Sequence, residues 1–262
     1  MGPYSSSKTR VAPLFDSLLQ RDASGSTWLD SLLSLGSRND GNAILPRGQR
    51  LVPEHRRRWG EDEVAFPAPL SLLEHLVQHI DTELVEASRD VGDARARRLA
   101  LARRDPAIVA EALQRLRAGE RGRYWFVLEG ESRPDALLET ENLVLCVEGK
   151  RTELGCTTHT SWMRRRSQLV RHMDAAVEHY PTKKILGLLI VEGAGGQHAT
   201  EPSAHWIAEC AAQYESSMIS DSLPHRSEDV RRRIAAGILG VTTWQAVCAA
   251  TNIDWASLPN AV

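Results

Sequence analysis

The sequence predicts an α/β fold, in which amphipathic helices cover a sheet of short, buried strands. Two segments, 143–147 and 184–191, are nearly continuous runs of aliphatic residues, which is typical of strands buried on both faces. Residues 70–84 instead carry apolar side chains at helical spacing. The 262 residues are 42% hydrophobic and 25% charged, as expected of a soluble globular chain.

Residues 1–62 are predicted to form a mainly helical N-terminal extension that is partly flexible, because polar stretches interrupt two short apolar segments at 14–19 and 28–35. Residues 63–262 are predicted to form the main domain, which begins with a helical part over 63–118.

The helical part contains a clear start signal. Asp105 is a good N-cap, Pro106 suits the first helical position, and Gly119 suits the end of the same helix.

A strand over 124–128 is predicted next, from its aromatic and branched residues, followed by a hairpin of two strands over 135–138 and 143–147. Glu141 and Asn142 are the expected turn, and a two-residue loop places Asp135 directly opposite Glu148.

The rest of the chain predicts a buried strand at 184–191, a loop at 193–196, a helix at 204–214 and a short strand at 238–241. Thr242 and Gln245 form a capping box for a closing helix that extends to Ala250.

The hairpin brings three ionisable groups together. Side chains alternate along a strand, so Glu148 and Lys150 share one face, and Asp135 projects from that face as the cross-strand partner of Glu148. Facing carboxylates repel each other, and a hard divalent cation such as Mg²⁺ removes that cost. The hypothesis is that Asp135 and Glu148 hold a metal ion and that Lys150 assists attack on a phosphodiester. The alternative is a surface hairpin with ordinary salt bridges, but the end of an apolar strand is a poor place for unpartnered charge.

Pro134-Asp135 and Glu148-Gly149-Lys150 resemble the motif of the PD-(D/E)XK nuclease superfamily, whose fold is restriction-endonuclease-like. The resemblance covers residues 113–241. It implies a mixed central sheet flanked by helices, in the order helix, three antiparallel strands, helix, strand. It also implies that Asp135 and Glu148 bind Mg²⁺ or Mn²⁺, that Lys150 is catalytic, and that the substrate is DNA. Many such nucleases act as homodimers, so a homodimer is a further expectation.

RecB-like members of that superfamily carry a Gln-x-x-x-Tyr motif on the helix after the lysine strand. This chain has Gln168 and His172 at that spacing, with histidine in place of tyrosine, and Gln168 is included among the catalytic residues. Arg164, Arg166 and Arg171 are expected to decorate the same helix and, with His172, to contact nucleic acid. A solvated basic face is the alternative.

The superfamily often adds a metal-binding glutamate from the helix before the first strand. Glu111 is the candidate, with Glu74 as the second choice. Glu129 and Glu131 lie just upstream of Asp135 and are further candidates.

The net charge of the chain neither requires nor excludes DNA as a binding partner, because the formal net charge is −2 while basic residues cluster locally. One cluster comprises Arg47, Arg50 and Arg56–Arg58. The four cysteines form no Cys-x-x-Cys pair, which argues against a zinc site and fits a reducing cytoplasm. No apolar run is long enough to cross a membrane, so no membrane partner is expected.

The leading expectation is therefore a metal-dependent nuclease that hydrolyses DNA. A catalytically inactive nucleic-acid-binding or interaction module on the same fold is the first alternative. An unrelated α/β enzyme, with the carboxylate pair in acid–base chemistry, is the second.

Overall fold

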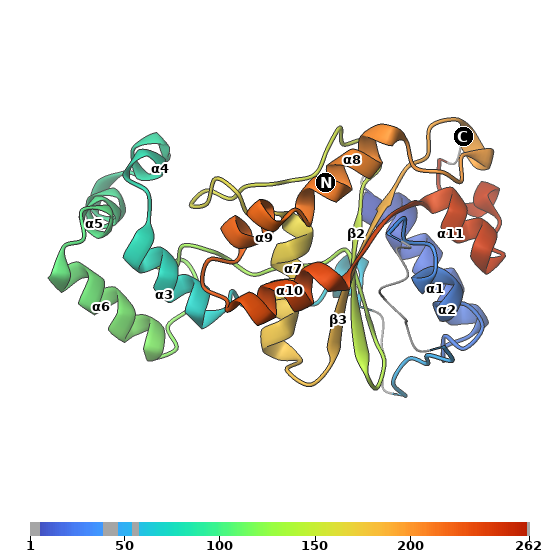
Figure 1. Ribbon diagram of the computed structural model, residues 1–262, viewed down its shortest axis with the longest axis horizontal. Coiled ribbons are helices and arrows are strands. Elements are labelled where there is room, and N and C mark those ends of the chain that lie inside the picture. Colours follow the sequence, from blue (N-terminus) through green and yellow to red (C-terminus); the bar gives the residue numbers. More distant parts are fainter. Residues whose placement is uncertain (1–5, 39–46, 54–57, 261–262) are drawn as a thin grey trace.

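A computed structural model describes residues 6–38, 47–53 and 58–260. Its centre is a mixed four-stranded sheet in the order β1-β2-β3-β4 (Figure 1). The strands are β1 (Ala136–Glu139), β2 (Leu143–Gly149), β3 (Lys184–Val191) and β4 (Ile238–Thr243). β1 and β2 are antiparallel, whereas β2–β3 and β3–β4 are parallel pairs. The predicted α/β fold with a mixed central sheet flanked by helices is confirmed at this level.

The helices lie before, between and after these strands. Before β1 come α1 (Ala12–Arg21), α2 (Leu29–Leu33), α3 (Leu70–His79), α4 (Thr82–Ala87), α5 (Gly92–Ala102) and α6 (Pro106–Arg117). After β2 come α7 (Gln168–His179), α8 (Ala204–Gln213), α9 (Ser216–Ser222), α10 (Glu228–Gly237) and α11 (Trp244–Thr251). Short turns of other helix types are η1 (Ser7–Val11), η2 (Gly60–Asp62), η3 (Gly196–His198) and η4 (Trp255–Ser257). Within the described ranges, no helix is both long and apolar enough to span a membrane.

The β1–β2 hairpin has the register that the sequence predicts. Ala136 pairs with Val147 and Glu139 pairs with Val144, so the register extends to Asp135 opposite Glu148. The turn is closed by the Thr140 amide, which donates to the Leu143 carbonyl at 2.9 Å. This confirms the two-residue loop on which the geometry of the site depends.

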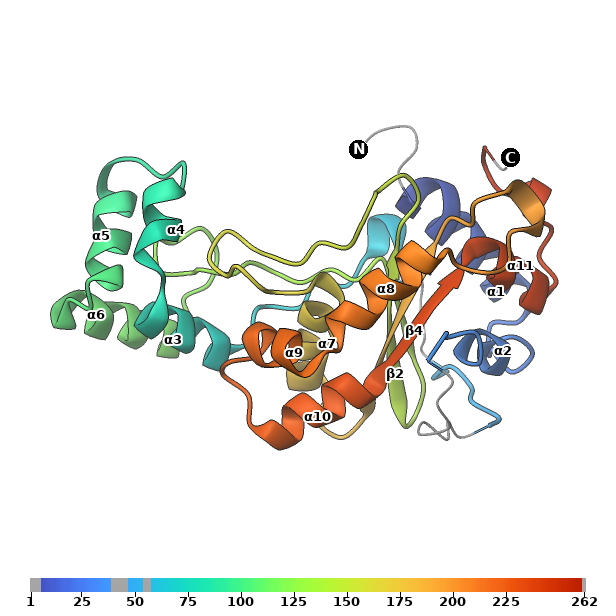
Figure 2. The ribbon, with the colours of Figure 1, turned by 45° about the horizontal axis from the view of Figure 1, so that its top comes forward.

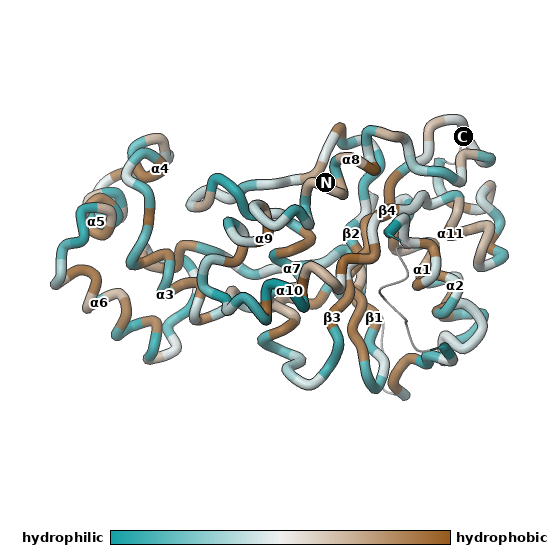
Figure 3. The backbone as a smooth tube through the Cα atoms, viewed as in Figure 1, coloured by the Kyte–Doolittle hydropathy of each residue, from teal (hydrophilic) through white to brown (hydrophobic). Residues whose placement is uncertain are grey.

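Each face of the sheet is covered by a layer of helices. On one face, α7 and α10 pack over Leu137, Val144, Cys146 and Ile185. On the other face, α1, α2 and α11 pack over a second apolar cluster that includes Leu138, Leu145 and Ile190. Figure 3 shows that the strands between these layers are predominantly hydrophobic.

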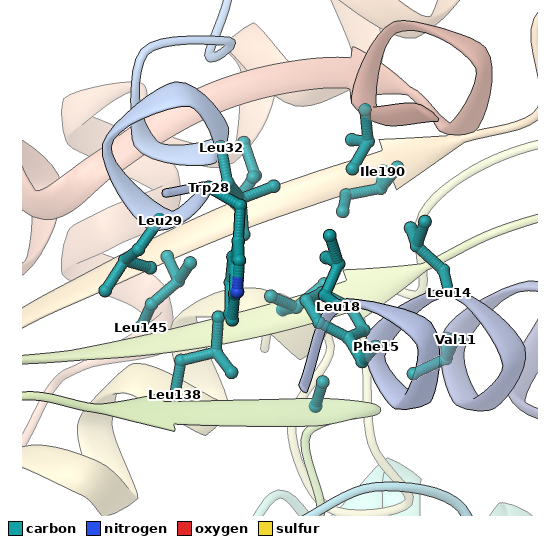
Figure 4. Close-up of a cluster of buried hydrophobic side chains, with 14 of the residues drawn as sticks. Val11, Leu14, Phe15, Leu18, Trp28, Leu29, Leu32, Leu138, Leu145 and Ile190 are labelled. Atoms are coloured by element: carbon teal, nitrogen blue, oxygen red, sulfur yellow. The ribbon is translucent and has the colours of Figure 1, made fainter. Parts of the chain in front are cut away.

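The first helices form part of this core. Leu14, Phe15 and Leu18 of α1 are fully buried, and Trp28 and Leu29 pack beside them on the sheet (Figure 4). The described part of residues 1–62 therefore contributes side chains to the same core as the strands.

Helices α3–α6 form a separate group with its own apolar cluster at one end of the molecule, beyond α7, α9 and α10 as seen from the sheet (Figure 2). The predicted helix over 70–84 is broken in two, because Ile80 is extended and the Asp81 carboxylate caps α4 by accepting from the Glu83 amide at 2.8 Å. The predicted cap at Asp105 is confirmed, since its carboxylate accepts from the amides of Ala107 and Ile108.

The predicted strand over 124–128 does not form. Phe126 and Leu128 are buried in the cluster of α3–α6, and the Trp125 carbonyl accepts from Arg98 Nε at 2.8 Å. The aromatic residues that suggest a strand therefore pack against helices.

The edge of β1 is instead bordered by residues 51–52 and 58–59. Isolated bridges join Leu51 to Thr140 and Trp59 to Ala136, and the Leu137 amide donates to the Arg58 carbonyl at 3.2 Å. The sheet thus gains an irregular antiparallel neighbour from a part of the chain that the sequence does not identify as a strand.

The later elements match their predicted positions closely, with one correction at the start of α11. Thr243, not Thr242, is the N-cap, because its side chain accepts from the Ala246 amide. Gln245 accepts from the Gly193 amide at 3.0 Å and so ties α11 to the loop after β3.

Candidate active site

The β1–β2 hairpin brings three ionisable side chains together on the face of the sheet that α7 covers: Asp135 just before β1, Glu148 in β2 and Lys150 just after it. Val144 and Cys146 of β2 pack against α7, so Glu148 also points to that face. The intervening Gly149 faces the opposite helix layer, where an added Cβ would lie only 2.7 Å from Trp244 Cζ2. The alternation of the strand and one close helix contact therefore fix the orientation of the site.

Glu148 and Lys150 form a buried ion pair. Lys150 Nζ lies 2.8 Å from Glu148 Oε1, and Lys150 and Glu148 are 7% and 3% exposed. Burial by itself raises the pKa of Glu148, but the hydrogen bond from His172, together with the charges of His172 and Lys150, lowers it overall. Burial by itself lowers the pKa of Lys150, but the Glu148 charge raises it overall. Both groups are therefore ionised at neutral pH.

Asp135 lies across the hairpin from Glu148. The Gly149 amide donates to Asp135 Oδ2 at 2.7 Å, which holds the carboxyl beside the end of β2. Burial, and then the neighbouring Glu148 charge, raise the pKa of Asp135 to about 8. Without a bound cation, Asp135 is therefore largely neutral at pH 7, as expected for two carboxylates that share a site.

The first turns of α7 hold the two charged residues of β2. Lys150 Nζ donates to Gln168 Oε1 at 3.1 Å, and His172 Nε2 lies 3.0 Å from Glu148 Oε2. The structure thus brings Asp135, Glu148, Lys150 and Gln168 together, as the sequence predicts. His172 also reaches this site, but as a fully buried partner of Glu148 and not as a surface contact to nucleic acid.

Glu63 is a neighbour of the site that the sequence analysis missed. Its carboxylate accepts from Ser7 Oγ at 3.4 Å, and its charge is among those that raise the pKa of Asp135. Burial, and to a lesser extent the Glu148 charge, raise the pKa of Glu63 itself. Glu63 follows η2 in a segment that the sequence assigns only to the beginning of the helical part. No pattern in the sequence connects it to Asp135.

The other candidate glutamates do not join the site. Glu111 on α6 pairs with Arg97 at 2.8 Å, and Glu74 on α3 pairs with Arg117 at 2.6 Å. Both belong to helices that pack around a different apolar cluster. The prediction that Glu111 binds the metal is therefore not supported by its position.

Glu129 and Glu131 are also engaged elsewhere. Glu129 is buried against Arg166, with Arg166 Nη2 and Glu129 Oε1 2.8 Å apart. Glu131 is exposed and pairs with Arg133 at 2.6 Å.

Two of the arginines expected to contact nucleic acid have structural roles. α7 begins only at Gln168, so Arg164 and Arg166 precede it. Arg166 is fully buried and pairs with two carboxylates, those of Glu129 and Asp174. Arg164 pairs with acidic residues at the start of α4. The prediction of a phosphate contact is therefore wrong for Arg166, because water and ligands do not reach its guanidinium.

Arg171 is different, because it is only half-buried and pairs with no carboxylate in the part of the chain that the structure describes. It lies on α7, one residue before His172. Arg56 and Arg57, from the predicted basic cluster, lie outside the described residues.

The donors at the site are oxygen atoms of the kind that bind hard cations. Among the residues that the structure describes, no three His, Cys, Asp or Glu side chains lie together as a metal-binding group. Mg²⁺ needs fewer protein ligands, since it keeps several waters and commonly uses only one or two carboxylates with substrate phosphates. Asp135 and Glu148 supply such a pair, and burial, followed by the Glu148 charge, raises the pKa of Asp135, which a bound cation would lower again. The residues present therefore fit Mg²⁺ or Mn²⁺.

Comparisons of the chain with protein-family models, with curated proteins and with solved structures found no match. The function must therefore be argued from the site itself.

Proposed function

We propose that this chain is a metal-dependent nuclease that hydrolyses DNA phosphodiester bonds, with a PD-(D/E)XK core built on β1, β2, α7 and β3. The observation that carries the proposal is the buried Glu148–Lys150 pair with Asp135 directly across the hairpin. An acid–lysine pair at the end of an apolar strand is costly to bury, and a structural role would be served at lower cost by apolar residues.

Each residue has a distinct part in the proposed reaction. Asp135 and Glu148 would hold Mg²⁺ or Mn²⁺, which supplies polarisation of a phosphoryl oxygen and acidification of a bound water. Lys150 is held by Glu148 Oε1 and Gln168 Oε1, so its ammonium has a fixed position. An ammonium has three donors, and the structure gives Lys150 Nζ these two acceptors among the described residues, so the third donor would stabilise charge that develops on the phosphate or orient the attacking water.

Two neighbouring residues would complete the site. Glu63 is close enough to act on Asp135 electrostatically and is the third carboxylate available for a cation or its waters. Arg171 would contact a DNA phosphate, because its guanidinium lies on the site helix without a carboxylate partner among the described residues.

The test is a plasmid-nicking and single-strand cleavage assay with Mg²⁺, Mn²⁺ or EDTA. Wild-type protein should cleave DNA only with metal, and Lys150→Ala and Asp135→Ala should abolish cleavage. Lys183→Ala is the matched control, because Lys183 forms a comparable ion pair, 2.6 Å from Glu139, at the far end of the hairpin.

The outcomes separate the leading function from its alternative. Cleavage by Lys150→Ala at the wild-type rate would refute the proposed site. If the folded wild type binds DNA but does not cleave it with either metal, the alternative is favoured, a catalytically inactive nucleic-acid-binding module on the same fold.

A further inference from the structure

His172 is the central member of a buried chain of hydrogen bonds that ends on Glu148. Ser132 Oγ lies 2.7 Å from His172 Nδ1, and His172 Nε2 lies 3.0 Å from Glu148 Oε2. Ser132 is 1% exposed, His172 is 0% exposed and Glu148 is 3% exposed. Water therefore does not compete with either contact, and the orientation of the Glu148 carboxylate depends on protein groups alone.

The direction of the hydrogen bonds follows from the chemistry of the three groups. An ionised carboxylate only accepts, so His172 must carry a hydrogen on Nε2 and donate it to Glu148. The Ser132 hydroxyl can donate or accept, so it can pair with Nδ1 whether or not that nitrogen carries a hydrogen. The Glu148 carboxylate therefore sets the hydrogen on Nε2, and Ser132, paired with Nδ1, holds the orientation of the ring.

Ser132 is itself fixed by the backbone. Its amide donates to the Phe66 carbonyl at 2.8 Å, and its carbonyl accepts from the Phe66 amide at 2.9 Å. The chain of hydrogen bonds thus begins at a backbone bridge between two segments and passes through α7 to β2. Its parts come from separate regions of the sequence, which the fold must assemble before Glu148 is held.

The spacing of α7 matches that of β2. Residues i and i+4 on a helix are about 6 Å apart along its axis, and residues i and i+2 on a strand are about 6.6 Å apart. His172 and Gln168 can therefore face Glu148 and Lys150 one to one, and the observed contacts follow this pairing. Each active-site residue of the strand thus has its own partner on the helix.

We propose that His172, oriented by Ser132, is a positioning residue that holds the Glu148 carboxylate in the geometry that binds the divalent cation. This inference rests on the proposed function. A buried histidine needs hydrogen-bond partners for its ring nitrogens, and in many proteins those hydrogen bonds have no role beyond stabilising the interior. Here one partner is the candidate metal ligand itself, and groups that orient a metal ligand commonly change metal affinity about 10- to 100-fold when removed.

The experiment measures Mn²⁺ binding to metal-free protein by electron paramagnetic resonance, with circular dichroism as the check on folding. His172→Phe removes both nitrogen atoms and should weaken Mn²⁺ binding about 10- to 100-fold. His172→Gln keeps an N–H donor near the position of Nε2 and should recover most of the loss. Ser132→Ala should weaken binding in the same direction but less, since it loosens only the orientation of the imidazole.

Met173→Leu is the control for packing, because Met173 is also fully buried on α7 and its replacement preserves volume. Its Mn²⁺ affinity should equal that of the wild type. A positioning role further requires that cleavage by His172→Gln approach the wild-type rate at saturating Mg²⁺.

Two distinct failures are informative. Wild-type Mn²⁺ affinity in folded His172→Phe would overturn the positioning role and leave the nuclease proposal standing. If His172→Phe does not fold, the test falls to His172→Gln and Ser132→Ala. Wild-type Mn²⁺ affinity in both, together with wild-type cleavage at limiting Mg²⁺, would equally overturn the positioning role. Absence of Mn²⁺ binding by the wild type would overturn the proposed function and this inference with it.

Discussion

Replacing Asp135 with asparagine should make the metal-free protein more stable at alkaline pH. Burial and the nearby Glu148 and Glu63 charges raise the pKa of Asp135 to about 8. The folded state therefore keeps a proton there that the unfolded chain loses near pH 4. The contribution of Asp135 to stability is greatest when the pH is below its pKa in the unfolded chain. It is lost as the pH rises through its pKa in the folded state. The asparagine of the variant has no proton to lose and can still accept from the Gly149 amide.

The size of the effect follows from the same pKa. Each tenfold change in proton affinity corresponds to about 1.4 kcal/mol, so a rise from an ordinary value near 4 to about 8 corresponds to an upper limit of about 5 kcal/mol. Asp135 is half-buried, and solvation of its exposed part reduces this figure. We expect the free energy of unfolding of Asp135→Asn at pH 9 to exceed that of the wild type by at least about 2 kcal/mol.

Urea unfolding in EDTA at pH 4, 6, 8 and 9 measures this difference directly. Other titrating groups are common to both proteins and largely cancel in the difference between their free energies of unfolding. The difference should be smallest at pH 4 and should grow up to pH 9. A difference that does not change with pH would refute the assignment of a proton to Asp135.

If Asp135 is a metal ligand, adding Mg²⁺ should reverse the stability advantage of Asp135→Asn over the wild type. Binding of Mg²⁺ requires the ionised carboxylate, so it should release a proton near neutral pH and strengthen as the pH rises to about 8. Mg²⁺ at a hundred times its Kd should stabilise the wild type by about 2.7 kcal/mol. The same concentration should stabilise Asp135→Asn much less, and equal stabilisation would place the metal elsewhere.

Three further substitutions test the packing and the site. Gly149→Ala should destabilise the fold by about 1–3 kcal/mol in urea unfolding, because its Cβ would lie 2.7 Å from Trp244 Cζ2; an unchanged midpoint would contradict that contact. Arg166→Ala should lower the free energy of unfolding by about 3–5 kcal/mol, because buried Glu129 loses its guanidinium partner and Asp174 keeps only its other partners, such as Arg226; the exposed Arg164→Ala should destabilise the fold much less, and similar losses would be the opposing result. Gln168→Leu should lower kcat about tenfold, because the site lysine loses an acceptor, and a wild-type kcat would exclude that role.

The central part of the site was predictable because it depends on short-range rules. A two-residue loop fixes the register of a hairpin, and strand alternation fixes the face, so Asp135 and Glu148 could be paired from the sequence. The i, i+4 spacing likewise placed Gln168 and His172 on one helical face. The partner of each helical residue could not be predicted, because it depends on how α7 lies over β2.

The predictions that failed depend on long-range packing. The aromatic segment at 124–128 has the composition of a strand, but its side chains pack into the apolar cluster of α3–α6. Glu111 was chosen because it precedes the strands in sequence. Glu63 instead comes near Asp135 through the bridges of Trp59 with Ala136 and of Phe66 with Ser132, which lie on either side of it. Arg166 was taken for part of a solvated or DNA-binding face, and its burial depends on Asp174 and Glu129, which are 8 and 37 residues away in sequence.

The residues of the site are less favourable for the stability of the fold than apolar residues would be in the same place. A four-residue set of Asp135, Glu148, Lys150 and His172 occupies an interior position that apolar side chains could fill more favourably. Another buried charge, that of Arg166, is paired through two hydrogen bonds with the Glu129 carboxylate. At the site, burial and then the Glu148 charge raise the pKa of Asp135, which has no cation of its own among the described ion pairs. Carboxyl groups with strongly shifted pKa values gather where a cation or a substrate completes a site, so the arrangement that costs stability is also an indication of function.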